Sequence, residues 1–282
     1  MDINQLVKNC NMPAMPNVAA KIMTLINNPN SNVNDIQNAI SADQALTTRI
    51  LKMSSSVFFK GRREISTITD AVMMLGLDTV KNLAIAIATK EIYKGNDPIA
   101  LRLWEHAIGA SVAASVVCKN QKRYKINLES AVVGALLHDI GKVVLNMSFQ
   151  DRYKIVNKRY YDEKIPLWRL ETEEFGFNHC DVGEELFKQW KFSAELIHIV
   201  KNHHTCSLPK EGEDIPDGLC EIINLSDSLC LILGAGIIKP MPEVSGDLTD
   251  IIKTLGLKPE DIDILLEEFE DKYIEEKLSY TA

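Results

Sequence analysis

Apolar residues recur at helical spacing along nearly the whole chain, and this periodicity limits the possible folds more than any other feature. Val18, Ile22 and Leu25 form one such series, and Ile36 and Ile40 form another, with polar residues between them. Spacings of three and four residues place side chains on one face of an α-helix, whereas a half-buried strand needs strict alternation. Such alternation is almost absent. The sequence therefore predicts an all-α fold.

Two clusters of helix-breaking residues divide the predicted helices. The first is Lys94–Pro98 and the second runs from Lys239 to Gly246, and both are rich in Gly or Pro. The second precedes an acidic amphipathic helix expected over Pro259–Tyr280, which we expect to pack on the body rather than to form a dimer contact. We predict an N-terminal helical subdomain, a helical core on which it packs, and a C-terminal extension: residues 1–96, 97–240 and 241–282.

Composition and charge restrict the class of protein. Lys and Arg number 31 against 39 Asp and Glu, a formal net charge of −8 at pH 7, which disfavours general nucleic-acid binding because phosphate backbones attract basic surfaces. No window approaches the roughly 18 apolar residues of a membrane span, and the first residues lack the pattern of a signal peptide. We therefore expect a globular, cytoplasmic protein with no membrane partner. The sequence leaves its oligomeric state open.

The chain has six cysteines, and none of them forms a C-x-x-C pair. Most lie in apolar, helical surroundings, where a reduced cysteine behaves as a small hydrophobic residue. We expect structural thiols rather than disulfides or metal ligands.

Five of the six histidines occur with aspartates in a definite order along the chain. One histidine on an apolar helix is usually structural, but an ordered set is rare by chance. Neutral imidazoles and carboxylates suit Fe, Mn, Zn, Ni or Co, and the absence of cysteines at ligand spacing disfavours a closed structural zinc. We predict that the set holds one or two divalent transition-metal ions. Its members are His106, His138, Asp139, His179, His203, His204 and Asp227.

The adjacent pairs in this set favour two ions over one. Neighbouring residues on a helix point about 100° apart, so His138 and Asp139 cannot both point at a single ion, although both can border a two-ion site. The same holds for His203 and His204. Asp139 is the natural candidate to bridge the two ions. A two-metal site of this kind can clamp a phosphoryl group.

The segment Ala135–Lys142 reads Ala-Leu-Leu-His-Asp-Ile-Gly-Lys. It resembles the signature of the HD superfamily of metal-dependent phosphohydrolases, in which the His and Asp bind metal. In phosphodiesterase members the following Lys contacts substrate phosphate, a role that the resemblance implies for Lys142; the alternative is a solvated lysine on a helix face. Asp139 and Lys142 are therefore the candidate catalytic residues.

The N-terminal part of the chain indicates which family related to the HD superfamily the sequence resembles. Met12–Pro16, Ile40–Thr47, Ile50–Met53 and Ile65–Gly76 resemble the HDOD family, the HD-related output domain of bacterial signalling. The resemblance covers roughly residues 8 to 235. It implies a signal-transduction output module that acts mainly by regulated interaction with other signalling proteins.

The order of the predicted ligands also looks like that of the HD-GYP phosphodiesterases of cyclic di-GMP. However, the segment Thr205–Lys210 after His204 contains no Gly-Tyr-Pro, which puts that substrate in doubt. Arg102, one helical turn before His106, stands where some relatives offer an extra acidic ligand, so we expect no third metal.

Three functions are compatible with these features. The first is a regulatory HDOD module that retains an HD-type metal site. The second is an active metal-dependent phosphohydrolase whose ligand is a nucleotide, a cyclic dinucleotide or another phosphoester. The third is a helical scaffold with an empty site, which the ligand set disfavours because unpaired charges are costly in an apolar interior.

Overall fold

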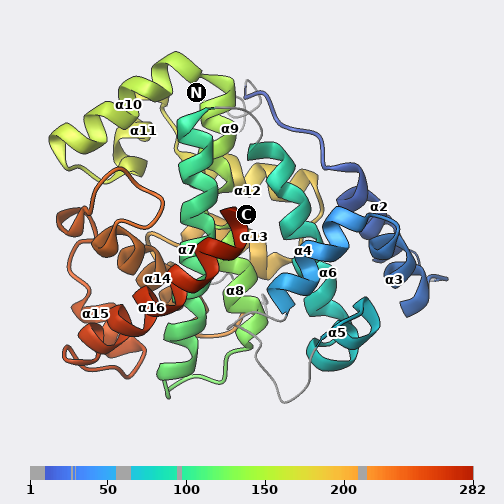
Figure 1. Cartoon of the computed structure of the whole chain (residues 1–282). Coiled ribbons are helices and arrows are strands. Elements are labelled where there is room, and N and C mark those ends of the chain that lie inside the picture. The colour runs from blue at the N-terminus through green and yellow to red at the C-terminus, as the bar shows by residue number, and fades with distance from the viewer. Residues whose placement is uncertain are drawn as a thin grey trace. The chain divides into compact units, whose positions relative to one another are not determined.

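The computed structural model describes residues 10–26, 28, 30–54, 65–93, 97–208 and 215–281. In this part of the chain every regular element is a helix (Figure 1), which confirms the predicted all-α fold. The chain divides into two compact units. We call Gly95–Tyr273, together with Met1–Pro13, the central unit, and Ala14–Lys94, together with Ile274–Ala282, the N-terminal unit. The three-part division predicted above stays a prediction.

The N-terminal unit is built from short helices in which α6 packs against α2, α4 and α5. Reciprocal side-chain caps define two of the helix starts: Asn32 with Asp35 at α3, and Thr67 with Asp70 at α5. Such a box satisfies backbone N–H groups that the first turn leaves without partners. The elements are α2 (Asn17–Ile26), α3 (Val33–Ser41), α4 (Gln44–Ser54), α5 (Ile68–Leu75), α6 (Leu77–Ala88) and the 3₁₀ helix η1 (Thr89–Tyr93).

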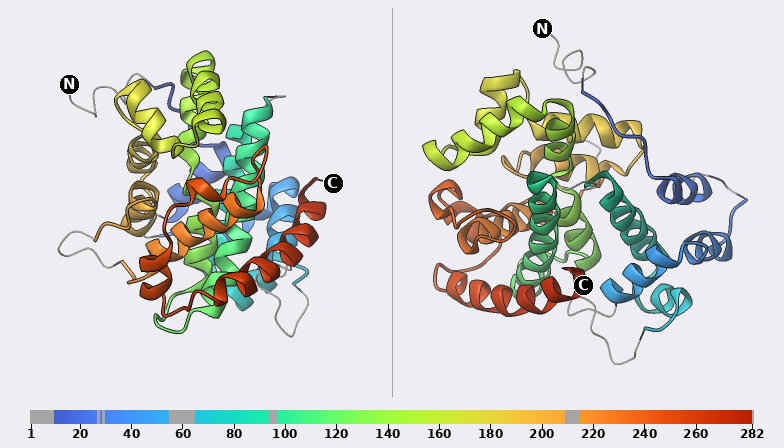
Figure 2. Two further views of the ribbon diagram at one scale, coloured as in Figure 1. Left: turned by 90° about the vertical axis from the view of Figure 1, so that its left-hand side faces the viewer. Right: turned by 45° about the horizontal axis from the view of Figure 1, so that its top comes forward.

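The central unit is organised around α7 (Pro98–Asn120), which is buried without interruption from His106 to Val117. A helix that is buried on all sides forms the middle of a core. α8 and α14 pack along α7, and α12 packs against α9 and α13 (Figures 1 and 2). The other elements are α8 (Leu128–Leu137), α9 (Ile140–Ser148), α10 (Gln150–Glu163), α11 (Leu167–Phe175), α12 (His179–Gln189), α13 (Ala194–Asn202), α14 (Leu219–Leu233), η2 (Pro242–Val244), α15 (Thr249–Thr254) and, up to Tyr273, α16 (Asp261–Thr281).

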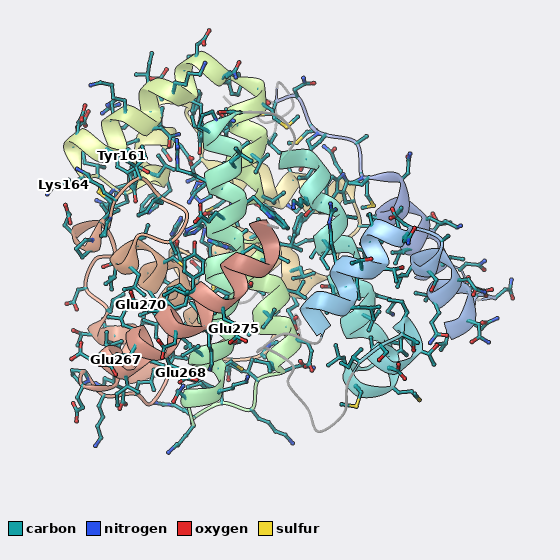
Figure 3. The ribbon with its side chains drawn as sticks, viewed as in Figure 1. Tyr161, Lys164, Glu267, Glu268, Glu270 and Glu275 are labelled. Carbon is teal, nitrogen blue, oxygen red and sulfur yellow. The ribbon has the colours of Figure 1, made fainter. Side chains whose placement is uncertain are left out.

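The acidic C-terminal helix α16 lies close to its predicted bounds. Up to Tyr273 it packs on α7: the Asn120 side-chain amide donates to Glu268 Oε2 at 2.8 Å, and the Tyr273 hydroxyl donates to Glu105 Oε1 at 2.9 Å. Figure 3 labels Glu268 on this helix. Leu265 and Phe269 are buried on its apolar face. These contacts agree with a helix packed on the body of the protein.

Of the first breaker cluster, residues 94–96 lie outside the described part of the chain. α7 begins directly afterwards at Pro98, and the Asp97 side chain accepts a hydrogen bond from the Ile99 amide at 3.0 Å. Among the helices described, none is at once long enough and apolar enough to cross a bilayer.

Candidate metal centre

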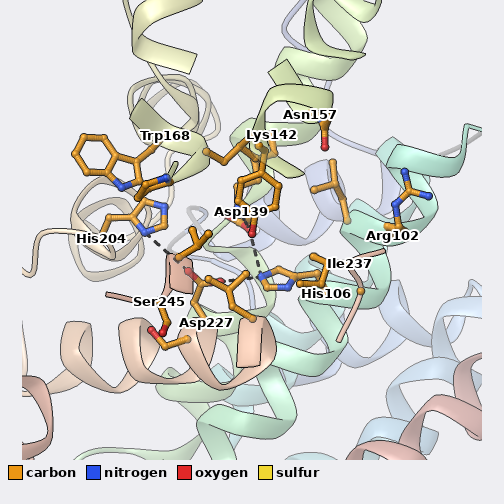
Figure 4. Close-up of a pocket in the computed structure, with 18 of the residues that line it drawn as sticks. Arg102, His106, Asp139, Lys142, Asn157, Trp168, His204, Asp227, Ile237 and Ser245 are labelled. Atoms are coloured by element: carbon orange, nitrogen blue, oxygen red, sulfur yellow. Dashed lines mark hydrogen bonds and ion pairs between the residues drawn. The ribbon is translucent and has the colours of Figure 1, made fainter. Parts of the chain in front are cut away.

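The seven predicted ligands all belong to the central unit, and their side chains form two adjoining groups. Figure 4 labels four of them, His106, Asp139, His204 and Asp227. His106 lies within α7, His179 begins α12 and Asp227 lies within α14. The other four residues lie at helix ends. His138 and Asp139 stand between α8 and α9, and His203 and His204 follow α13.

This placement corrects the reasoning about adjacent pairs. His138 caps the C-terminus of α8, and Asp139, with φ −99° and ψ 11°, precedes α9. His203 likewise caps α13. Neither pair is part of a continuous helix, so the 100° separation does not apply.

One group of ligand atoms lies around His106 and His138. Asp139 Oδ2 is 3.4 Å from His106 Nε2 and 3.3 Å from His138 Nε2. Asp227 Oδ1 is 3.1 Å and 3.9 Å from the same two nitrogen atoms. Each of the four residues offers one ligand atom, and these atoms lie within 4.8 Å of one another. We call these four residues cluster A.

A second group of ligand atoms lies on the other side of Asp139. Asp139 Oδ1 is 3.3 Å from His179 Nε2 and 3.6 Å from His203 Nε2. His179 Nε2 is 3.4 Å from His203 Nε2 and 3.0 Å from His204 Nε2. Donors bound tetrahedrally at 2.0–2.1 Å would be about 3.3 Å apart, so these spacings suit one ion. We call His179, His203 and His204 cluster B; Asp139 faces both clusters with different oxygens.

Cys180 is an addition that the sequence did not predict. Its Sγ is 4.0 Å from both ring nitrogens of His203, and it lies within 4.8 Å of the ligand atoms of cluster B. The neighbouring histidines also change the pKa of its thiol. Although burial favours the neutral thiol, His179 and His203 lower the pKa of Cys180 to about 6.

Backbone carbonyls orient three of the imidazoles. The Nδ1 atoms of His106, His138 and His203 lie 3.2, 2.6 and 3.0 Å from the carbonyl oxygens of Ala235, Ala135 and Val200. A ring nitrogen that donates to a carbonyl leaves the other nitrogen with its lone pair available. We assign this tautomer from the partners, and it directs Nε2 of each ring into the site.

A buried carboxylate orients the fourth imidazole. Glu171 Oε2 accepts from His179 Nδ1 at 2.5 Å and from the His179 amide at 2.9 Å. Tyr153 donates its hydroxyl to Glu171 Oε1 at 3.1 Å, and both Glu171 and Tyr153 are fully buried. Sequence reasoning missed Glu171, because it begins an acidic stretch that is typical of a solvated helix face. Only its partners distinguish it from Glu173, which is exposed.

Two glycines allow close approach at the site. A Cβ on Gly141 would lie 1.9 Å from the His179 carbonyl oxygen, so α9 could not pack this closely on α12 with a larger residue there. Gly236 has a φ of +71°, and its Cβ would lie 2.1 Å from the His106 amide nitrogen. Glycine alone tolerates both the contact and the positive φ. The close contact with α12 therefore explains why glycine stands at position 141 of the His-Asp-Ile-Gly-Lys segment.

The charges of the site are strongly coupled. Burial disfavours the Asp139 carboxylate, but His138 and Lys142 outweigh burial and hold the pKa of Asp139 well below its usual range. Lys142 Nζ lies 2.5 Å from Asp139 Oδ2, and this contact helps raise the pKa of Lys142 despite burial. Burial also opposes the charged form of His179, yet Glu171 raises the pKa of His179 to about 9. Lys142 is thus buried and paired rather than solvated on a helix face.

The donor atoms fit a divalent cation. Four buried side-chain atoms have no hydrogen-bond partner among the described residues: His106 Nε2, His138 Nε2 and Asp227 Oδ1 in cluster A, and Asp139 Oδ1, which faces cluster B. Native proteins rarely leave such atoms without partners, and each instance requires an explanation. A cation at cluster A would accept lone pairs from three of these atoms, and a second cation at cluster B would accept one from Asp139 Oδ1. The described part of the chain therefore contains His/Asp clusters that could bind metal.

A cavity of about 220 Å³ opens onto the clusters (Figure 4). His106, Asp139, Lys142, His204 and Asp227 line it. Its remaining walls come from α7, α10, α11, α14 and the segment around η2. Any molecule held there would lie against the candidate ligands.

Fold and site together define an all-helical protein with a buried His/Asp centre suited to metal ions. The model of the HDOD domain family matches residues 12–206, and the chain belongs to the HDOD family. This confirms the resemblance drawn from the sequence. Asp227 lies beyond the matched residues, although its carboxylate is 3.1 Å from His106.

Individual relatives are distant in sequence. The chain is 26% identical over 203 residues to an uncharacterized protein of Treponema pallidum, covering 72% of this chain and 39% of that protein. A crystal structure of an HDOD domain protein with unknown function from Geobacter sulfurreducens matches with a TM-score of 0.71 at 24% identity, over 97% of this chain and 94% of that one. A "Putative phosphohydrolase" from Shewanella amazonensis matches with a TM-score of 0.68 at 22% identity, over 95% and 93% of the two chains.

Proposed function

We propose that the central unit holds two divalent transition-metal ions, drawn from Fe, Mn, Zn, Ni and Co. His106, His138, Asp139 and Asp227 would hold one ion, and Asp139 would share the second with cluster B. The observation that carries this proposal is the set of four buried donor atoms without hydrogen-bond partners, three in cluster A and one, Asp139 Oδ1, that faces cluster B. Burial of polar groups without partners costs free energy, and metal ligation removes that cost.

The proposed function is that of a regulatory signalling module. Its proposed ligands lie in α7, α12 and α14 and at the ends of α8, α9 and α13, so bound ions would tie those helices into one arrangement. A ligand that binds only one arrangement stabilises it by about 2.7 kcal/mol at a concentration of 100 times its Kd. That free energy is large enough to favour the arrangement of helices that presents one surface to a signalling protein. Membership of the HDOD family supports this function over catalysis as the main role.

Phosphohydrolase activity is the second candidate, and the cavity is the observation that favours it. A bound divalent ion would supply Lewis acidity toward phosphoryl oxygens. Lys142, whose ammonium group lines the same cavity beside Asp139, is placed to offset the negative charge of a phosphoryl group. The walls of the cavity would hold the ester against the clusters.

Elemental analysis of the full chain, purified without chelator, tests the metal centre. We expect close to two ions per chain, and a protein that takes up none of the five metals on titration would refute the proposal. A hydrolysis screen of Mn- and Fe-loaded protein then separates the two functions. The screen covers cyclic di-GMP, other cyclic nucleotides and generic phosphodiesters, with Asp139→Ala as the control. Turnover of about 1 per second or faster that is lost in the control would establish the enzyme.

A further inference from the structure

Arg102 is a half-buried cationic side chain of the cavity that the metal centre does not use. The cavity is lined by three cations, Arg102, Lys142 and Arg169, but by only two carboxylates, Asp139 and Asp227. Neither carboxylate is free to pair with Arg102: Asp139 contacts Lys142 at 2.5 Å, and Asp227 is one of the proposed metal ligands of cluster A. The cavity thus has an excess of positive charge, which two metal ions would increase.

Arg102 has no ion-pair or hydrogen-bond partner in the described part of the chain, and it is half-buried on the cavity wall. Arg169 differs, because it is exposed and its guanidinium lies 5.0 Å from the ring centre of Trp168. Figure 4 shows Arg102 beyond His106, on the side opposite Trp168. A half-buried guanidinium without a carboxylate partner is suited to an anion that comes from outside the chain.

The position of Arg102 determines what kind of anion fits. It precedes His106 by four residues on α7, so the two side chains share a helix face at Cα positions about 6 Å apart along the axis. An anionic group beside Arg102 would therefore lie in the same cavity as one at the clusters, but not at the same place. The cavity, at about 220 Å³, falls below the roughly 300–1,000 Å³ of pockets that enclose drug-sized ligands. A small ligand fits this space better than a cyclic dinucleotide.

We propose that the cavity binds a small phosphate compound with two anionic groups, one at the clusters beside Lys142 and the other on the guanidinium of Arg102. This inference rests on the proposed function for the first group, because the clusters provide that position. Arg102 selects diphosphate-like ligands over single phosphates. An arginine can bind two oxygens of one phosphate in a planar fork, which a lysine cannot reproduce.

The test compares inorganic pyrophosphate with orthophosphate by calorimetric titration of the full chain. Wild type should bind pyrophosphate at least about tenfold more tightly, since one charge-assisted contact provides an effect of that size. Arg102→Ala should remove most of this difference while changing orthophosphate binding by less than about twofold, and Arg102→Lys should restore part of it. Arg152→Ala is the matched control, because Arg152 pairs with Glu174 away from the cavity and its loss should leave the preference intact.

The titrations are run on metal-free protein and on Mn²⁺-loaded protein with Mn²⁺ matched in both solutions. Equal affinity of wild type for the two anions would overturn the inference, as would an equal loss of both in Arg102→Ala with unchanged circular dichroism. If elemental analysis finds no metal, the proposed function fails, but the metal-free titrations still decide whether Arg102 distinguishes the anions. The two failures are therefore separable.

Discussion

The two units have different kinds of core. In the described part of Ala14–Lys94, the buried side chains are apolar except for Thr89, whose hydroxyl donates to the Ala86 carbonyl. The central unit buries four histidines of the clusters completely or nearly so, together with Asp139, Lys142, Glu171 and Asp227. The first core needs only hydrophobic burial and helix caps. The second contains charges that are stable only when each has a partner.

Because the cores differ, we expect the N-terminal unit to contribute to stability and the buried charges of the central unit to contribute to metal binding. Changes in the N-terminal unit should alter the free energy of unfolding without altering the metal centre. Changes among the buried charges of the central unit should alter metal content first, because those residues would be ligands or would orient ligands. Four predictions test this separation.

Loss of Asp139 should have the largest effect. Its two oxygens face different clusters, so Asp139→Ala should reduce bound metal more than loss of any single histidine. Asp139→Asn serves as a second variant that keeps the side-chain volume if alanine prevents folding. Elemental analysis provides the measurement, and Asp162→Asn, at an exposed ion pair with Lys158, is the control. Near-normal metal content in both Asp139 variants would show that Asp139 is not a ligand shared by the two ions.

Loss of the Glu171 carboxylate should weaken metal binding without removing a metal ligand. Glu171→Gln replaces the carboxylate that accepts from His179 with a neutral amide, which is a weaker acceptor. Metal affinity should therefore fall about 10- to 100-fold, as for other residues that orient ligands. Metal titration provides the measurement. Glu173→Gln is the matched control, since Glu173 is exposed and pairs with Arg159. An equal effect in both variants would exclude a positioning role for Glu171.

Loss of a helix cap should affect the N-terminal unit alone. The Thr67 hydroxyl accepts from the Asp70 amide at 3.0 Å, and Asp70 accepts from the Thr67 amide at 2.9 Å. Thr67→Ala should therefore lower the free energy of unfolding by about 1 kcal/mol, measured by urea denaturation. Thr67→Ser, which keeps the hydroxyl, is the control. A parallel loss of metal would contradict the separation between the units.

The smallest effect concerns thiol reactivity within the central unit. Burial and the negative charge of Glu129 raise the pKa of Cys118 to about 11. The neutral thiol therefore dominates at pH 7, and alkylation of Cys118 should be slow there and rise about tenfold per pH unit until the pH nears that pKa. Mass spectrometry of iodoacetamide-treated protein measures the rate. Labelling at pH 7 as fast as that of an unperturbed cysteine would contradict the pKa.

The sequence by itself determined the helical architecture and the chemical identity of the candidate ligands. Periodicity is local, so it predicts helices such as α16 to within two residues of their observed bounds. The order of His and Asp residues, with the family resemblance, named the seven site residues. Their role as ligands stays a prediction, but the structure brings all seven into two adjoining groups that share Asp139.

Only the tertiary structure decided which atoms meet. His106 is 129 residues from the carbonyl of Ala235 that orients its ring, and no local pattern encodes such a contact. Glu171 and Cys180 looked ordinary in the sequence, because an acidic helix face and a buried thiol are each common. Their roles depend on the packing of α11, α12 and α13. That packing comes from burial of apolar surface shared across the whole unit, which gives each residue its neighbours without marking it in the sequence.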